Sequence, residues 1–325
     1  MNVSHVQKGR NFLKQKFTRD VNVMPPSSGY PNYLEAPVFR PPSEANSLIL
    51  QATLGCSHNA CTFCGSYRTK QFRVKPFSQF REEVQELTRK YRIQPQRIFL
   101  ADGDAFILSA SKLLEILNLL TKEFPSVERI SIYASGTNVQ QKSDEELAQI
   151  RDAGLEMIYI GLESGDEEVL RNANKGITNQ DHISACLRLK DAGFTLSPII
   201  ILGLGGKHLS QQHAVHTAET LNAINPPYLA ALTLMLVPGT ELHAQTKRGE
   251  FIPLTPIEIL QELRILIDGL TKLTRCVFRT NHASNYLPLR GVLSVDQKRL
   301  LNTIDSVLSD PNLADRLRPE YIRGL

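Results

Sequence analysis

The sequence predicts an α/β fold with a mainly parallel sheet. From Leu48 onward, short apolar runs alternate with amphipathic stretches, and each run is bounded by Gly, Pro or polar residues, as in strands buried on both faces. The expected strands are residues 48–54, 97–102, 129–134, 157–163, 195–203 and 229–237. The expected helices lie near 78–92, 109–123, 143–153, 166–173, 180–192 and 210–223. This alternation implies right-handed crossovers and fits either an open barrel or a doubly wound sheet.

Length and composition limit the class of protein. The chain has 325 residues, of which 42% are hydrophobic and 22% charged, which suits one main domain with a large core. The net charge of +4 is too mild to argue for nucleic acid, and it leaves RNA open. No run approaches the length of a membrane span, and the first residues lack the apolar centre of a signal peptide. We expect no membrane partner. Five cysteines, three of them in one loop, suit a reducing compartment, so we expect a cytoplasmic protein.

The two ends of the chain differ from the alternating centre. Residues 1–24 are basic, and residues 25–46 are rich in Pro and Ser, which disfavours a helix or a central strand. After Leu242 the sequence predicts a long helix at 256–273, a strand at 276–280 and a helix at 294–308. The expected division is an N-terminal arm over the barrel at 1–46, a core at 47–240 and a C-terminal helical extension at 241–325.

Three of the five cysteines follow the first expected strand directly. Cys56, Cys61 and Cys64 have the spacing Cx4Cx2C, and three thiolates in one short loop suit a metal or an iron-sulfur cluster better than a disulfide. A zinc site would need a fourth ligand, for which His58 is the only near candidate, and we interpret His58 as a loop residue. The other two cysteines, Cys186 and Cys276, are interpreted as small buried hydrophobes.

A four-iron cluster normally has four cysteine ligands, so three would leave one iron open to a small molecule. The loop resembles that of the radical S-adenosylmethionine (SAM) superfamily, although the usual spacing there is Cx3Cx2C and this chain has one more residue between Cys56 and Cys61. The resemblance implies a [4Fe-4S] cluster on Cys56, Cys61 and Cys64, SAM on the open iron, and reductive cleavage to methionine and a 5′-deoxyadenosyl radical. It also implies a partial (β/α)6 TIM-like barrel, which decides between the two architectures.

The same resemblance assigns SAM contacts near the first two strands. Phe63, before the last cysteine, takes the place of the aromatic residue near the adenine. Gly103 and Asp104 follow the second strand at the end of the family's GGE motif, where a glycine permits close approach and a carboxylate accepts hydrogen bonds from an ammonium group. Asp102 replaces the first glycine of that motif. A plain turn is the alternative interpretation.

The segment Tyr159–Thr178 carries the strongest downstream signal. It ends a strand in Glu163, and a carboxylate leaving an apolar strand needs a partner or a polar site. Glu163 and Lys175 on one rim could hold a ribose diol and a carboxylate. The segment resembles coproporphyrinogen-oxidase-like and tRNA-modifying radical SAM enzymes, which implies that both residues contact SAM. A surface ion pair is the alternative.

Later strand ends give weaker signals. Ser135 and Asn138 could hydrogen-bond a ribose or simply form a turn. Gly203 lies where the family brings backbone close to adenine or methionine. His282 and Asn285 follow the C-terminal strand and are hypothesised to line the substrate side of the barrel, with a structural histidine as the alternative.

We therefore expect a radical SAM enzyme with a [4Fe-4S] cluster and SAM as cofactors and a flavodoxin- or ferredoxin-type electron donor. Its substrate is unidentified: tRNA modification, heme-pathway chemistry and natural-product tailoring are all open. One alternative is an iron-sulfur redox or iron sensor without radical chemistry, which would not need Glu163 and Lys175. A zinc-stabilised binding module is another.

Overall fold

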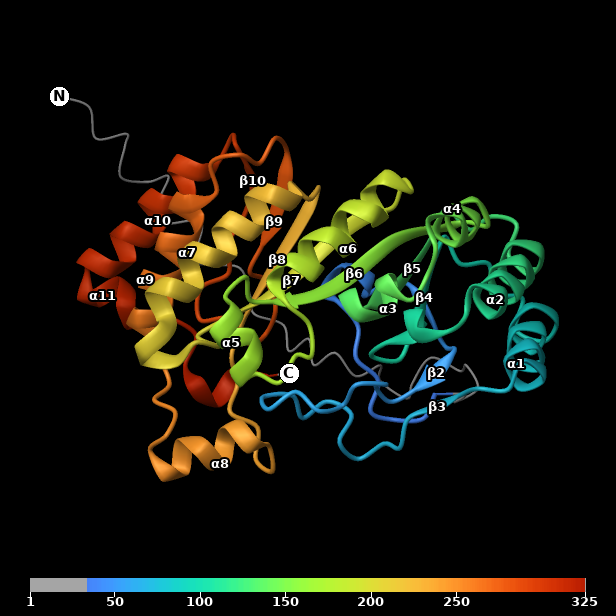
Figure 1. Cartoon of the computed structure of the whole chain (residues 1–325), viewed down its shortest axis with the longest axis horizontal. Coiled ribbons are helices and arrows are strands. Elements are labelled where there is room, and N and C mark those ends of the chain that lie inside the picture. The colour runs from blue at the N-terminus through green and yellow to red at the C-terminus, as the bar shows by residue number, and fades with distance from the viewer. Residues whose placement is uncertain (1–33, 325) are drawn as a thin grey trace.

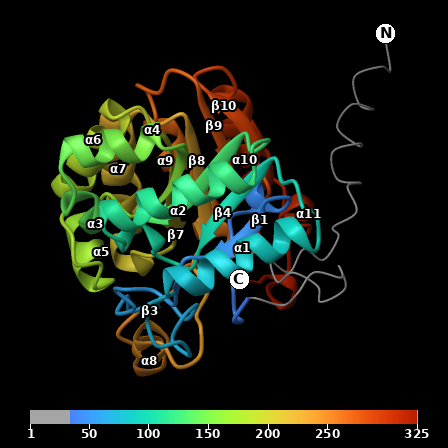
Figure 2. The same ribbon diagram turned by 90° about the vertical axis from the view of Figure 1, so that its right-hand side faces the viewer.

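The computed structural model describes residues 34–324, so the basic segment expected at 1–24 lies outside the described residues. Eight strands form one sheet in the order β1-β4-β5-β6-β7-β8-β9-β10 (Figure 1; β1 is labelled in Figure 2). Its strands are β1 (Leu48–Gln51), β4 (Arg97–Ala101), β5 (Arg129–Ala134), β6 (Leu155–Glu163), β7 (Thr195–Leu202), β8 (Tyr228–Thr233), β9 (Cys276–Arg279) and β10 (Arg290–Leu293). All neighbouring pairs are parallel except β9 with β10. The order begins at β1 and ends at β10, so the curved sheet is the expected partial barrel.

Helices cover the outer face of this sheet (Figures 1 and 2). The long ones are α1 (Phe77–Arg89), α2 (Ala110–Glu123), α4 (Asp144–Asp152), α6 (Asn179–Asp191), α7 (Gly206–Ile224), α9 (Pro256–Gly269) and α10 (Gln297–Ser309). The short ones are α3 (Gly136–Gln140), α5 (Glu167–Asn172), α8 (Glu241–Arg248) and α11 (Pro311–Ala314). Capping explains the start of α4, because Ser143 and Glu146 form a reciprocal capping box. No helix within residues 34–324 is both long and apolar enough to cross a membrane.

The first strand differs from the expectation of a single run over 48–54. It ends at Gln51, and β2 (Thr53–Leu54) leaves the main sheet to pair antiparallel with β3 (Arg73–Val74). This small ribbon brings together the two ends of the segment that carries Cys56, Cys61 and Cys64. The strand expected over 229–237 ends at Thr233, and its last residues run on as loop.

The two faces of the sheet carry different packing. The outer face and the helices share the large apolar core, whereas the inner face carries a smaller cluster of aromatic and aliphatic side chains. On the inner face, Phe99 meets Tyr133 and Tyr159 edge to face, with ring centroids 4.9 and 6.1 Å away. Leu34 and Val38 pack against this cluster, so the described part of the arm runs along the inside of the barrel.

The C-terminal residues add both strands and helices. Strand β9 pairs parallel with β8, and β10 turns back beside β9, so both continue the main sheet. Helices α9 and α10 pack against one another on the outer side. The expected helices at 256–273 and 294–308 correspond to α9 and α10.

Candidate functional site

A cavity of about 270 Å³ lies at the carboxyl ends of the parallel strands. Cys56, Cys61 and Cys64 all line it. Six of the eight expected SAM contacts also line it: Phe63, Gly103, Asp104, Ser135, Glu163 and Lys175. Strand ends on the same edge of a parallel sheet bring residues far apart in sequence together, and this edge is where barrel enzymes carry their chemistry.

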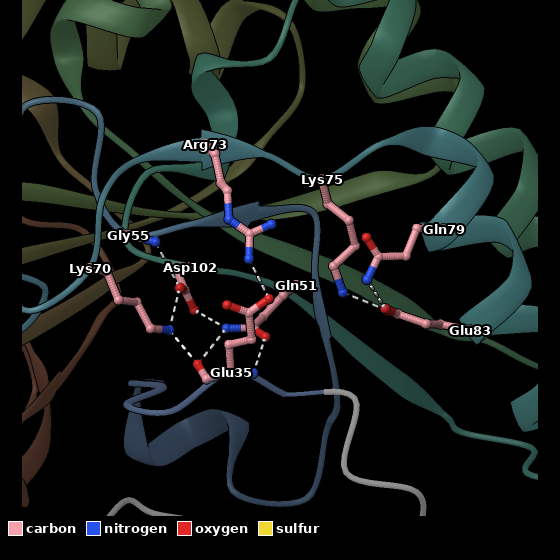
Figure 3. A network of polar contacts seen from close by, with 9 residues as sticks. All are labelled: Glu35, Gln51, Gly55, Lys70, Arg73, Lys75, Gln79, Glu83 and Asp102. Atoms are coloured by element: carbon pink, nitrogen blue, oxygen red, sulfur yellow. Dashed lines mark hydrogen bonds and ion pairs between the residues drawn. The ribbon is translucent and has the colours of Figure 1, made fainter.

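The cysteine loop is tied at its base by a buried carboxylate (Figure 3). Asp102 accepts hydrogen bonds from the backbone N–H of Gly55 at 2.9 Å and from Gln51 Nε2 at 2.8 Å. Its third partner is Lys70 Nζ at 2.8 Å, and its own side chain is fully buried. Gly55 precedes Cys56 and Lys70 follows Cys64, so Asp102 joins both ends of the loop. Its side chain is therefore occupied in positioning the loop.

Further contacts fix the middle of the loop. Arg68 donates to the carbonyl oxygens of Cys64 at 2.8 Å and Cys61 at 2.9 Å. The Thr62 N–H donates to the carbonyl of Ala173, next to the end of α5, at 3.0 Å. The His58 ring makes a 2.7 Å contact through Nε2 with a backbone carbonyl, that of Asn174. His58 thus joins the loop to the segment after α5.

The three thiols lie in the cavity wall, where they are largely shielded from water. Burial raises the pKa of Cys56, Cys61 and Cys64, while the ammonium group of Lys175 acts in the opposite direction on Cys56 and Cys61. Within residues 34–324 no group of three His, Cys, Asp or Glu side chains converges as a single metal ion requires. In a four-iron cluster each cysteine binds a different iron, so the three thiolates surround a shared space and do not converge on a single point. Three thiols on one cavity wall fit such a cluster.

Glu163 and Lys175 form an ion pair in the cavity wall. Lys175 Nζ lies 2.9 Å from Glu163 Oε1, and each side chain is only 12% exposed. Glu163 has a φ of +63°, at a bulge where the β6–β7 register shifts. Burial lowers the pKa of Lys175, but the Glu163 carboxylate, Cys61 and Cys56 together raise that pKa above its ordinary value. The pair is thus a charged part of the cavity and not a solvated surface pair.

Asp104 is held by two neighbours. Asn138 Nδ2 donates to Asp104 Oδ1 at 2.5 Å, and the Ser57 hydroxyl donates to Oδ2. Burial raises the pKa of Asp104. Ser135 caps α3 by accepting from the Asn138 N–H at 3.3 Å. Asn138 itself does not line the cavity, so its side chain orients Asp104.

Comparison with known proteins identifies the family. Residues 50–221 match the family model described as the radical SAM superfamily. The chain belongs to the radical SAM superfamily. A [4Fe-4S] cluster and SAM are the cofactors of that superfamily, and the three loop cysteines of this chain line one cavity.

The individual relatives are distant. The heme chaperone HemW of Bacillus subtilis is 20% identical over 201 residues, which span 60% of this chain and 52% of that protein. A tRNA uridine(34) acetyltransferase of Methanocaldococcus infernus is 27% identical over 120 residues, which span 37% of this chain and 22% of that one. The chain therefore covers about half or less of these relatives.

Among solved structures, coproporphyrinogen III oxidase (HemN) from Escherichia coli matches with a TM-score of 0.52 and 19% identity, over 68% of this chain and 52% of that chain. At this identity the match shows the fold alone. It confirms that the partial barrel of the present chain is the radical SAM type.

Three residues singled out in the sequence lie elsewhere in this radical SAM fold. Gly203 does not line the cavity; its N–H donates to Glu262 Oε1 at 2.6 Å, which joins the end of β7 to α9. Asn285 is buried. Its Nδ2 donates to the carbonyl of Ala231 at 2.9 Å, and its Oδ1 accepts a hydrogen bond from the Thr233 hydroxyl at 2.9 Å. His282 lines a second, larger cavity below the first.

Several residues that line the cavity were not expected from the sequence, and Tyr67 and Phe39 are two of them. An ideal Cβ on Gly103 would lie 2.4 Å from the ring of Tyr67, so Tyr67 fills the space beside that glycine. The Tyr67 hydroxyl is buried and has no hydrogen-bond partner among the described residues. Phe39, from the Pro-rich arm, also lines the cavity. Neither residue stands in a recognisable motif.

Gly161 offers a test of the Glu163–Lys175 pair. Its ideal Cβ would lie 2.5 Å from Glu163 Oε1 and 3.1 Å from Lys175 Nζ. We expect Gly161→Ala to displace the pair and weaken SAM binding by about tenfold or more, which corresponds to ~1.4 kcal/mol. Anaerobic titration calorimetry on reconstituted protein measures this. Gly324→Ala is the control, because its Cβ would meet only Ala283, at 4.0 Å. Equal SAM affinity in both variants would refute the role of the pair.

Proposed function

We propose that this chain is an enzyme that reductively cleaves SAM at a [4Fe-4S] cluster and starts radical chemistry on a substrate. One observation carries the proposal: the three loop thiols, Asp104 and the Glu163–Lys175 pair all face the same cavity. A protein that only held a cluster as a redox or iron sensor would need the thiols, but not the charged groups beside them.

The cavity residues divide the work of holding the cofactors. Cys56, Cys61 and Cys64 would bind three irons and leave the fourth for the amino and carboxylate groups of SAM. Asp104, preorganised by Asn138 and Ser57, would accept hydrogen bonds from the N–H groups of the SAM amino group. When bound, the cluster supplies the electron that breaks a C–S bond of SAM, giving methionine and a 5′-deoxyadenosyl radical.

The remaining wall would hold the carboxylate of SAM and its nucleoside end. Lys175 would bind the SAM carboxylate, and Glu163 would accept hydrogen bonds from the ribose diol. Phe63 packs beside an apolar cluster that includes Leu204 and Leu242, which suits a surface for the adenine ring. Ile199 and Leu232 line the cavity beneath, and such apolar walls exclude water from a reactive radical.

Cleavage consumes one electron from outside the chain. We infer a flavodoxin- or ferredoxin-type donor, because both classes deliver single electrons. We place the enzyme in the cytoplasm, where a reducing milieu keeps the loop thiols available for iron.

Lys175→Met tests the proposed role of the cavity cation. The variant keeps the length of the side chain and removes its charge, so we expect iron content to stay unchanged and SAM affinity to fall by about tenfold or more. Electron paramagnetic resonance of the reduced protein, recorded with and without SAM, reports binding at the cluster. Lys207→Met is the matched control, since the Lys207 side chain is 57% exposed and pairs with Glu258 at the surface. If the spectrum of the wild-type cluster does not change when SAM is added, the result would favour an iron-sulfur sensor over an enzyme.

A further inference from the structure

The barrel lumen contains a second cavity, of about 500 Å³, next to the cofactor cavity. Alternate residues of β6 connect the two: Met157 and Tyr159 line the larger cavity, whereas Gly161 and Glu163 line the cofactor cavity. Side chains two apart on a strand share a face, so these positions follow one inner wall from the amino end to the carboxyl end. Tyr133, Ile199 and Leu232 line both cavities, so a ligand in the larger one would reach the edge of the cofactor site.

The larger cavity is strongly basic. Four arginines line it: Arg40 from the arm, Arg97 and Arg129 at the starts of β4 and β5, and Arg279 in β9. The described residues that line it include no Asp or Glu. The undescribed residues 1–33 contain a single acidic residue, Asp20.

Two of these arginines are direct neighbours in the sheet. Arg97 and Arg129 are partners in the parallel β4–β5 register, and both line the cavity. Like charges at neighbouring strand positions repel one another, so the arrangement favours an anion between them. A bound oxyanion would convert this repulsion into attraction.

The nearby carboxylate compensates only part of this charge. Glu44, fully buried, accepts from Arg129 Nη2 at 2.7 Å and from the Tyr159 hydroxyl at 2.6 Å. The Nε–H groups of Arg40 and Arg129 remain buried with no acceptor in the described part of the chain. An unpaired buried N–H is costly, and guanidinium groups bind carboxylate and phosphate oxygens through paired hydrogen bonds.

We propose that the substrate is a small molecule with a carboxylate or phosphate group, which Arg40 and Arg129 hold in the larger cavity. This inference rests on the proposed function. The volume of the larger cavity falls in the range of small-molecule sites. Anchored at that end, the substrate extends past Tyr133 and Ile199, and its reactive carbon points toward the cofactor cavity.

Anaerobic titration calorimetry of the reconstituted enzyme tests this, with pyrophosphate, glutarate and the uncharged glutaramide as probes. We expect pyrophosphate or glutarate to bind and glutaramide not to bind. Which of the two anions binds more tightly shows whether the site prefers a phosphate or a carboxylate. Arg40→Gln and Arg129→Gln should each weaken that binding by about tenfold or more. Arg40→Gln is the cleaner variant, because Arg129 also supports Glu44. Arg73→Gln, a half-exposed arginine paired with Glu35 outside this cavity, should bind like the wild type.

The proposal fails if neither oxyanion binds, if glutaramide binds equally well, or if both lumen variants bind like the wild type. The same samples are assayed for 5′-deoxyadenosine with SAM and dithionite. SAM cleavage without oxyanion binding removes only this inference. Oxyanion binding that depends on Arg40 and Arg129, without SAM cleavage, supports the anion site and removes the proposed function.

Discussion

Cys61→Ala is expected to abolish SAM cleavage while the fold persists. The Cys61 side chain lies in the cavity wall, and the loop backbone is held independently, through Arg68 and through Thr62 with Ala173. Losing one of three thiolates leaves the cluster without a complete ligand set, so 5′-deoxyadenosine should fall to background. Iron content, circular dichroism and chromatographic assay of 5′-deoxyadenosine report the three properties separately.

Cys186→Ala is the matched control for this change. Cys186 is fully buried in α6 and packs in the outer apolar core, so its loss should cost about 1 kcal/mol of stability and no activity. SAM cleavage at the wild-type rate in Cys61→Ala would contradict the assignment of Cys61 as a cluster ligand. Equal loss of activity in both variants would point to general damage to the fold.

Asp102→Ala should destabilise the protein more than any surface change. Its carboxylate and Lys70 form an ion pair whose side chains are 0% and 9% exposed (Figure 3). The substitution leaves the Lys70 ammonium buried without a counter-charge, with the carbonyl oxygen of Glu35 as its remaining acceptor. Breaking such a pair costs about 3–5 kcal/mol. We also expect weaker iron retention, because the Gly55 N–H loses its acceptor just before Cys56.

Arg73→Gln gives the comparison within the same network. Arg73 pairs with Glu35, but both side chains are about half exposed, at 50% and 51%. Exposed pairs contribute roughly 0–1 kcal/mol, so its melting temperature should barely change. Anaerobic thermal unfolding by circular dichroism measures both variants. Equal shifts in melting temperature would contradict the buried-clamp account of Asp102.

Much of the fold follows from apolar periodicity. The six expected strands correspond to β1 and β4 to β8, because each shows a mainly apolar run between turn residues. The two-residue strands β2 and β3 carry no such pattern, and their pairing depends on the loop that separates them. Strand β10 begins with Arg and Gly and has one fully buried residue, Leu293, so no apolar run marks it in the sequence.

The candidate site was predictable where its residues stand in local motifs. The cysteine spacing and the Glu163–Lys175 segment indicated one end of the barrel, and the structure brings them to one cavity. The partners of Asp102 and Gly203 could not be predicted, because they come from Lys70 and Glu262, which are distant in sequence. The arginines of the lumen likewise lie on separate elements and share no motif.

The measurement that tests the central claim most directly is the accumulation of 5′-deoxyadenosine. The protein is reconstituted anaerobically with iron and sulfide, reduced with dithionite and given SAM, and the products are separated by chromatography. We predict that 5′-deoxyadenosine accumulates and that SAM shifts the cluster's electron paramagnetic resonance spectrum. If a cluster forms, but SAM stays intact and does not change the cluster's spectrum, the result would contradict radical SAM chemistry in this chain.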